Sequence, residues 1–340
     1  MGKILFTSTK TAVKSVLASI AGVVGKHNWP FSEPRLWILM YHRILPESAP
    51  EYQLEEPGMI VTPETFRQHL QTVRKHFTIV DLHEWIEAAR KAETLPQKSI
   101  ALTFDDGWAD NFTYAFPILK DMEVKATIFL VSEYINTNKS FWPNRLQRIL
   151  HHLGENWTAD PDMKWLKELC REDYTGAPLT QNLTSRIIDH CKQLDDATIQ
   201  DKLLRIEKDT GIVKNNNDLL NFVQIEEMRE SGLITYGSHG ATHRRLTKNT
   251  SRSITEYEIK SSKLQLKKLT NLDARLFCYP NGDINQDSIE FIKTTYEAAV
   301  TCEHGCNTRH TELTRLSRIG IHENATDSPA KLLARISGWN

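Results

Sequence analysis

The sequence predicts an α/β fold in which parallel strands form a (β/α)7 barrel. Apolar runs of strand length alternate with helix-like stretches along most of the chain, and strands separated by helices pair in parallel through right-handed crossovers. About seven such units favour a closed barrel over an open sheet. The chain has 340 residues, of which 40% are hydrophobic, so it can bury a large core.

The strands are predicted from continuous apolar runs, which are typical of strands covered on both faces. They span residues 36–41, 100–104, 126–131, 233–236, 275–279, 298–302 and 316–321. Thr62 and Pro63 are the N-cap and first residue of a predicted helix, and Asp81 is the N-cap of the next. Further helices are predicted over residues 111–122, 225–231, 253–269 and 287–296.

Between residues 140 and 222 the strand pattern is missing, and the sequence is polar and helix-like. We interpret this stretch as a helical insertion. The predicted organisation is therefore a basic amphipathic segment over 1–35, a barrel over 36–325 that contains the insertion, and a C-terminal tail or helix over 326–340.

Residues 1–26 contain four lysines and no acidic side chain, and apolar residues recur there at helical spacing. One interpretation is a basic amphipathic helix that lies on a membrane surface. A secretory signal and a helix packed on the domain are the alternatives. We expect a cytoplasmic protein with peripheral contact to the inner membrane through this segment, with secretion left open.

Composition excludes several classes of protein. The 42 basic residues are balanced by 43 acidic ones, which argues against nucleic acid as a partner. The five cysteines form no C-x-x-C pair, so a disulfide framework is not expected and a reducing compartment is favoured. No apolar stretch is long enough for an ordinary transmembrane helix.

Three clusters of residues that could take part in catalysis or metal binding follow predicted strands, where a barrel of this kind carries its active site. In the first, Asp105 and Asp106 come directly after a buried strand. Two adjacent buried carboxylates are costly unless a cation compensates them. The alternative is a pair of aspartates that caps the next helix.

In the second cluster, His239 and His243 are four residues apart at the end of another strand. Such a pair alone is a weak signal, and both could be ordinary surface residues. Together with one carboxylate, however, two imidazoles form the three-ligand site with open positions that catalytic zinc prefers. The second carboxylate would then be free to accept a proton.

The third cluster is the turn Tyr279-Pro280-Asn281-Gly282 after a strand. Pro-Asn-Gly is a strong turn former in any context. A functional interpretation is that a backbone N–H near Asn281 points at a developing oxyanion.

Together these clusters resemble the polysaccharide deacetylase family, carbohydrate esterase family 4, over roughly residues 36–322. The resemblance implies the family's distorted barrel. It also implies that Asp105 in Thr103-Phe104-Asp105-Asp106-Gly107 is the catalytic base and that Asp106, His239 and His243 bind a divalent metal, Zn²⁺ before Co²⁺ or another ion. By the same resemblance, Tyr279 and Asn281 contact the substrate or oxyanion.

The sequence departs from the family pattern in three places. Gly240 stands where the family has Ser or Thr, so the geometry of that loop is in question. Cys278 stands where an arginine usually holds the base, and Arg318 is a candidate replacement from a neighbouring strand. The segment Ile319-Gly320-Ile321-His322 is similar to the motif that ends in the general acid, so His322 is either that acid or a residue that caps a helix or faces solvent.

The expected activity is therefore metal-dependent hydrolysis of N-acetyl groups on amino sugars of a polysaccharide or a lipid-linked glycan. A non-catalytic carbohydrate-binding or scaffold protein of the same fold is the alternative. A metal-free glycosidase is disfavoured because its two carboxylates must lie on opposite sides of the sugar.

Overall fold

The structure is a computed structural model that describes residues 25–170, 174, 176–211 and 218–339. Residues 1–24, which contain most of the predicted basic segment, lie outside the described residues. Among the described residues, no helix combines the length and apolar character needed to cross a membrane.

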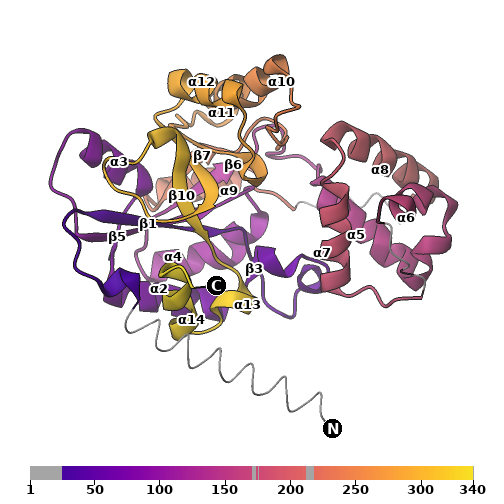
Figure 1. The fold of residues 1–340 in the computed structure, drawn as a ribbon, viewed down its shortest axis with the longest axis horizontal. Helices are drawn as coiled ribbons and strands as arrows, with labels where there is room; N and C mark the ends of the chain where they lie inside the picture. Colours follow the sequence, from indigo (N-terminus) through magenta and orange to yellow (C-terminus); the bar gives the residue numbers. More distant parts are fainter. Residues whose placement is uncertain (1–24, 171–173, 175, 212–217, 340) are drawn as a thin grey trace, which may run out of the picture.

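Seven parallel strands form a closed barrel, which confirms the predicted fold class (Figure 1). Strand β1 pairs with β5 on one side and with β10 on the other, so the first and last strands of the chain are neighbours. The remaining strands follow sequence order around the barrel. The strands are β1 (Arg35–Tyr41), β5 (Lys98–Phe104), β6 (Ala126–Leu130), β7 (Ile234–Ser238), β8 (Leu276–Cys278), β9 (Ala298–His304) and β10 (Leu316–Gly320).

Three two-residue strands were not predicted. Strands β2 (Arg43–Ile44) and β3 (Ile60–Val61) pair with each other, and β4 (Thr78–Ile79) adds to the edge of β5. They are too short for the sequence pattern to show a period.

Alternate residues of β1 contribute to two separate apolar clusters. Leu36 and Ile38 belong to a cluster with Phe129 of β6, whereas Trp37, Leu39 and Tyr41 pack with residues of the surrounding helices. This alternation explains why the strand has a continuous apolar sequence. The helices associated with the barrel are α2 (Pro63–His76), α3 (Leu82–Arg90), α4 (Phe116–Asp121), α9 (Phe222–Glu230), α10 (Arg252–Glu256), α11 (Ser262–Thr270), α12 (Gln286–Thr295), α13 (Glu323–Thr326) and α14 (Pro329–Ile336).

Two π-helical segments interrupt predicted helices. Residues Asn111–Ala115 precede α4, and Tyr257–Ser261 separate α10 from α11, where one continuous helix was predicted. Such segments shift the side chains that follow around the helix axis and are frequent at functional sites. The N-caps agree with the sequence: the side chains of Thr62 and Asp81 accept hydrogen bonds from the backbone N–H groups of Thr65 and Glu84.

Between β6 and α9 the chain forms a helical unit on one side of the barrel (Figure 1). It contains α5 (Trp142–Leu153), α6 (Lys164–Cys170), α7 (Gln181–Cys191) and α8 (Asp196–Thr210). These helices share an apolar core of their own, which includes Leu146, Trp157 and Ile187. The unit is inserted at the ends of the strands where the predicted site residues lie.

Candidate metal and catalytic site

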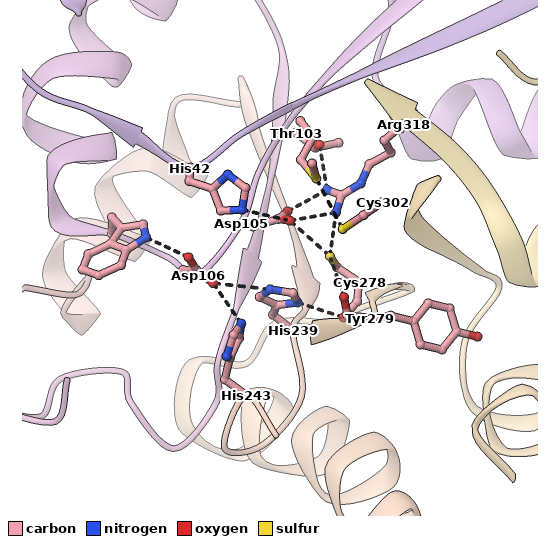
Figure 2. Close-up of polar contacts among 12 residues, drawn as sticks. His42, Thr103, Asp105, Asp106, His239, His243, Cys278, Tyr279, Cys302 and Arg318 are labelled. Carbon is pink, nitrogen blue, oxygen red and sulfur yellow. Dashed lines mark hydrogen bonds and ion pairs between the residues drawn. The ribbon is translucent and has the colours of Figure 1, made fainter. Parts of the chain in front are cut away.

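The chain turns sharply after β5, and this turn separates the two carboxylates. Asp106 and Gly107 both have left-handed backbone angles, with φ of 73° and 74°. A Cβ on Gly107 would lie 2.8 Å from a methyl carbon of Leu130, so only glycine fits there. As a result Asp105 faces Arg318, whereas Asp106 faces the two histidines (Figure 2).

Asp106, His239 and His243 form a compact group of possible metal ligands. The Oδ1 atom of Asp106 lies 3.3 Å from the Nε2 atom of each histidine. The other oxygen, Oδ2, accepts a 2.9 Å hydrogen bond from the indole of Trp108. The Nδ1–H of His239 donates to the carbonyl of Cys278 at 2.8 Å, because a carbonyl can only accept. In the neutral imidazole this leaves the lone pair of Nε2, the atom nearest Asp106, available to bind a cation.

The charges within this group are coupled. Burial alone would raise the pKa of Asp106, but its contacts with His239 and His243 hold that pKa well below its ordinary value. Burial likewise opposes the charged form of His243, and the Asp106 carboxylate nevertheless raises its pKa. The carboxylate is thus ionised and the site attracts positive charge.

The donor set fits a divalent cation. The ligand atoms, one carboxylate oxygen and two imidazole nitrogens, lie within 4.8 Å of one another. Such a set suits zinc and similar metals, and three protein ligands leave coordination positions for water and substrate. The bond from His239 to the Cys278 carbonyl is the kind of outer contact that orients metal-ligating histidines.

A buried glutamate holds the loop that carries both histidines. Glu258, only 1% exposed, accepts hydrogen bonds from the backbone N–H groups of Ala241 and Thr242, both at 2.9 Å, and from the Thr242 hydroxyl. It lies in the second π-helical segment. Gly240 has a φ of 84°, and a Cβ there would lie 2.8 Å from the Glu258 carboxylate. Glu258 therefore shapes this loop, and glycine at position 240 leaves room for it.

Asp105 is paired with Arg318, which is fully buried on β10. The two guanidinium nitrogens of Arg318 each donate a 2.7 Å hydrogen bond to one oxygen of Asp105. Burial would raise the pKa of Asp105, but the charge and hydrogen bonds of Arg318 lower it to about 2. Arg318 is itself held by the Thr301 carbonyl at 2.8 Å and by the Thr103 hydroxyl at 3.1 Å.

The thiol of Cys278 contacts both Asp105 and Arg318. It lies 3.4 Å from Asp105 Oδ2 and 3.1 Å from an Arg318 nitrogen. The side chain is fully buried, and its thiol is in contact with the ion pair. Burial raises the pKa of this thiol well above its ordinary value, which keeps it neutral.

Two histidines lie at the ends of β1 and β10. The Nε2 atom of His42 is 3.8 Å from Asp105 Oδ2, and its side chain is 18% exposed. His322 is the N-cap residue of α13, and burial lowers its pKa. Among the described residues, no hydrogen bond or ion pair connects His322 to Asp105 or to the metal-ligand group. The structure therefore brings His42, rather than His322, to the predicted base.

The turn after β8 places Asn281 and Tyr279 differently. Asn281 is exposed in a left-handed conformation with φ of 56°, and its amide side chain donates to Asp283. The backbone N–H of Tyr279 donates to Val300 at 3.3 Å, and its hydroxyl donates to the Thr314 carbonyl at 3.1 Å. Both donors of Tyr279 are thus used within the protein, and its ring points away from the histidines (Figure 2).

Sequence reasoning missed Glu258 and the contact of Trp108 with Asp106. A charged residue on the inward side of a predicted helix, next to Ile259, was the available signal for Glu258. Trp108 is the fourth residue after β5, a position that gave a weaker signal.

Comparison with known proteins shows which proteins the chain is similar to. A family model described as polysaccharide deacetylase matches residues 92–160 and 206–297. YxkH of Bacillus subtilis (strain 168), provisionally named a polysaccharide deacetylase, is 34% identical over 56 residues, which are 16% of this chain and 20% of that protein. The chain therefore matches only about a fifth of the length of this relative.

Two further proteins match most of the chain. A poly-β-1,6-N-acetyl-D-glucosamine N-deacetylase of Staphylococcus epidermidis is 22% identical over 280 residues, 80% of this chain and 71% of that protein. The solved structure of the Streptococcus pyogenes deacetylase PplD in complex with acetate has a TM-score of 0.59 and 22% identity, covering 90% of this chain and 99% of that one. The chain is thus similar to polysaccharide deacetylases over residues 92–160 and 206–297, and it shares the fold of a solved deacetylase.

Proposed function

We propose that the protein is a metal-dependent N-deacetylase that removes acetyl groups from N-acetylglucosamine units of a β-1,6-linked glycan. One observation carries this proposal: the adjacent carboxylates have different partners. Asp105 pairs with an arginine, whereas Asp106 faces two histidines. The substrate class is suggested by the printed activity of the Staphylococcus epidermidis relative.

Asp106, His239 and His243 would hold the cation, with Zn²⁺ as the expected ion and Co²⁺ as an alternative. When bound there, the cation supplies Lewis-acid polarisation of the amide carbonyl and lowers the pKa of water.

Asp105 is the proton acceptor in the proposed reaction. Arg318 keeps it ionised at neutral pH and fixes both of its oxygens, which limits the directions from which it can accept a proton. As the oxygen of water adds to the amide carbon, Asp105 takes the proton of that water. A backbone N–H of the turn at Asn281 is our candidate donor to the oxyanion.

The amine nitrogen must gain a proton before the C–N bond breaks, because an amide anion is a poor leaving group. His42 and His322 are the two candidates for the proton donor. The 3.8 Å separation of His42 from Asp105 supports His42. The products are acetate and the free amino sugar.

The test is acetate release from β-1,6-linked N-acetylglucosamine oligomers by the full chain, combined with metal analysis. We expect a stoichiometric divalent ion, loss of activity on chelation, and recovery when Zn²⁺ or Co²⁺ is added back. Asp106→Asn should lose both metal and activity, whereas Asp105→Asn should keep the metal and lose activity. A metal-free protein that binds the glycan without releasing acetate would support the non-catalytic alternative.

A further inference from the structure

The side chain of Trp108 lies between the metal-ligand carboxylate and a buried arginine. Its indole N–H donates to Asp106 Oδ2 at 2.9 Å, while Oδ1 of the same carboxylate faces the two histidines. The guanidinium carbon of Arg43 lies 4.1 Å from the centroid of the Trp108 ring. Trp108 is only 1% exposed, so both contacts are shielded from water. One ring thus connects Arg43 to the carboxylate of Asp106.

Two carboxylates hold Arg43 over this ring. Its Nε donates to Asp110 Oδ2 and its Nη1 donates to Glu55 Oε2, both at 2.8 Å. Burial opposes the charged form of Arg43, but Asp110 and Glu55 raise its pKa above the ordinary value, so the guanidinium remains cationic. Because two of its nitrogens are bound by separate partners, the guanidinium cannot turn away from the indole without breaking an ion pair.

The two carboxylates are themselves anchored by different parts of the chain. Asp110, in the turn after β5, accepts a hydrogen bond from the backbone N–H of Ile44 at 2.9 Å. Glu55, which precedes β3, accepts a hydrogen bond from the side-chain amide of Asn144 in α5 at 2.8 Å. The position of Arg43 is therefore fixed by the barrel and by the helical insertion together.

A cation in this position changes the chemistry of the indole. It is attracted to the negative face of the ring, and the attraction is stronger where water is excluded. It also draws electron density from the ring, which makes the indole N–H a stronger hydrogen-bond donor, because groups in a buried polar network polarise one another. A stronger donor at Oδ2 holds the Asp106 carboxylate in the orientation that presents Oδ1 to the histidines.

From these contacts we propose that Arg43 is a positioning residue of the metal site, which acts through the Trp108 indole to hold Asp106 and thereby strengthens the binding of a divalent cation. This inference rests on the proposed metal-dependent function. It also gives the helical insertion a part in metal binding, because Asn144 holds Glu55 and Glu55 holds Arg43.

The first measurement is the affinity of the full chain for Zn²⁺, determined by competition with a chelator. Trp108→Phe keeps an aromatic ring beside Arg43 and removes the N–H that holds Asp106. Its Zn²⁺ affinity should fall by about 10- to 100-fold, which is the usual effect of losing a partner that orients a metal ligand. The visible absorption of bound Co²⁺ should change in the same variant, because this spectrum reports the arrangement of the ligands.

The second measurement asks whether Arg43 acts through the indole. Arg43→Met alone leaves two buried carboxylates unpaired, so it is combined with Glu55→Gln and Asp110→Asn in a neutral triple variant. The neutral triple variant should bind Zn²⁺ about tenfold more weakly than the wild type. In a Trp108→Phe background the same three changes should weaken binding by less than about threefold, because the effects of residues in contact are not additive.

Trp85→Phe is the matched control. Trp85 is also buried, and its indole N–H donates at 3.1 Å to Ser99 near the start of β5, whereas Asp106 follows the end of that strand. This variant should keep its Zn²⁺ affinity within about twofold of the wild type, and urea unfolding reports the stability of every variant.

Three outcomes would overturn the role of Arg43: an unchanged Zn²⁺ affinity in Trp108→Phe, an equal loss in Trp85→Phe, or the same effect of the three charge changes in both backgrounds. A wild-type protein that binds neither Zn²⁺ nor Co²⁺ would instead overturn the proposed function, and this inference with it.

Discussion

Arg318 binds Asp105 through two parallel 2.7 Å hydrogen bonds, and neither side chain is more than 2% exposed. The guanidinium comes from the last strand of the barrel and the carboxylate from the end of β5. Arg318 thus contacts Asp105 as the resemblance implies for an arginine of the family's third motif, a position that is Cys278 in this chain. A short thiol at position 278 leaves space for the guanidinium, 3.1 Å from its sulfur.

Removing the guanidinium should affect both stability and activity. Arg318→Met leaves the buried Asp105 carboxylate without its partner, which costs about 3–5 kcal/mol of unfolding free energy. Arg318→Lys keeps the charge but not the fork of two donors, so it should be more stable than Arg318→Met and still lose activity. Urea unfolding and acetate release measure the two effects, and the removal of both charges in Arg318→Met with Asp105→Asn should recover part of the stability. A stable, fully active Arg318→Met protein would contradict the role of the pair.

The residue that protonates the departing amine can be identified by comparing substrates whose leaving groups do and do not need a proton. His42→Gln should lower kcat on an N-acetyl sugar by about 100- to 10,000-fold, because the amine cannot leave without a proton. The same variant should lose far less activity on an activated acetate ester, whose leaving group needs no proton. His322→Gln is the comparison, and we expect it to change kcat on the amide by only a few fold. The opposite ranking of the two variants would assign the role to His322.

The loop of His239 and His243 gives a counterintuitive prediction. Restoring the hydroxyl typical of the family, with Gly240→Ser, should impair the protein. The left-handed backbone costs about 1–2 kcal/mol for a residue with a Cβ, and that Cβ would lie 2.8 Å from the Glu258 carboxylate. Displacing this support should weaken metal binding by about 10- to 100-fold.

Metal affinity, measured by titration with a competing chelator, tests this prediction independently of activity. Thr242→Ser is the control, because it keeps the hydroxyl that donates to Glu258. Unchanged affinity in Gly240→Ser would show that the loop does not depend on this contact.

His69 should make the protein sensitive to acid. It is fully buried, accepts a hydrogen bond from Tyr41 through Nδ1 and donates to the Thr326 carbonyl through Nε2. Burial lowers its pKa to about 4, although nearby Glu323 and Asp327 oppose the shift. The unfolded chain therefore binds a proton below its ordinary pKa of about 6.5, whereas the folded protein does not until about pH 4.

The contribution of His69 is fully present above about pH 6.5 and declines as the pH falls toward 4, by about 3 kcal/mol in total. Urea unfolding at pH 7 and pH 5 should show a smaller decline in His69→Gln than in the wild type. His310→Gln, at an exposed position, serves as the comparison. Equal declines in wild type and His69→Gln would refute this assignment.

The barrel strands could be predicted from sequence because each is a continuous apolar run, and their observed limits differ from the predicted ones by at most two residues. The π-helical segments could not be predicted, because one extra residue in a turn barely alters the hydrophobic period. The 253–269 helix was therefore expected to be continuous. The helix is continuous over residues 252–270, and the π-helical segment within it carries Glu258, which contacts the metal-ligand loop.

The candidate site could be predicted for those residues that combine a reactive side chain with a position after a barrel strand. Asp105, Asp106, His239 and His243 follow strands directly, and parallel strands bring their carboxyl ends to one rim. His42 also follows a strand, but a single histidine carries no spacing signal. Trp108 acts through one hydrogen bond to Asp106, which only the folded turn reveals.

The pairing of β1 with both β5 and β10 has a consequence for biosynthesis. During translation, the first six strands of the barrel emerge while the Asp105 carboxylate still lacks its cationic partner, since Arg318 lies on the last barrel strand, β10. A nascent or truncated protein that ends before residue 316 therefore has neither a closed barrel nor the guanidinium that orients Asp105. Both features appear only after β10 has been synthesised.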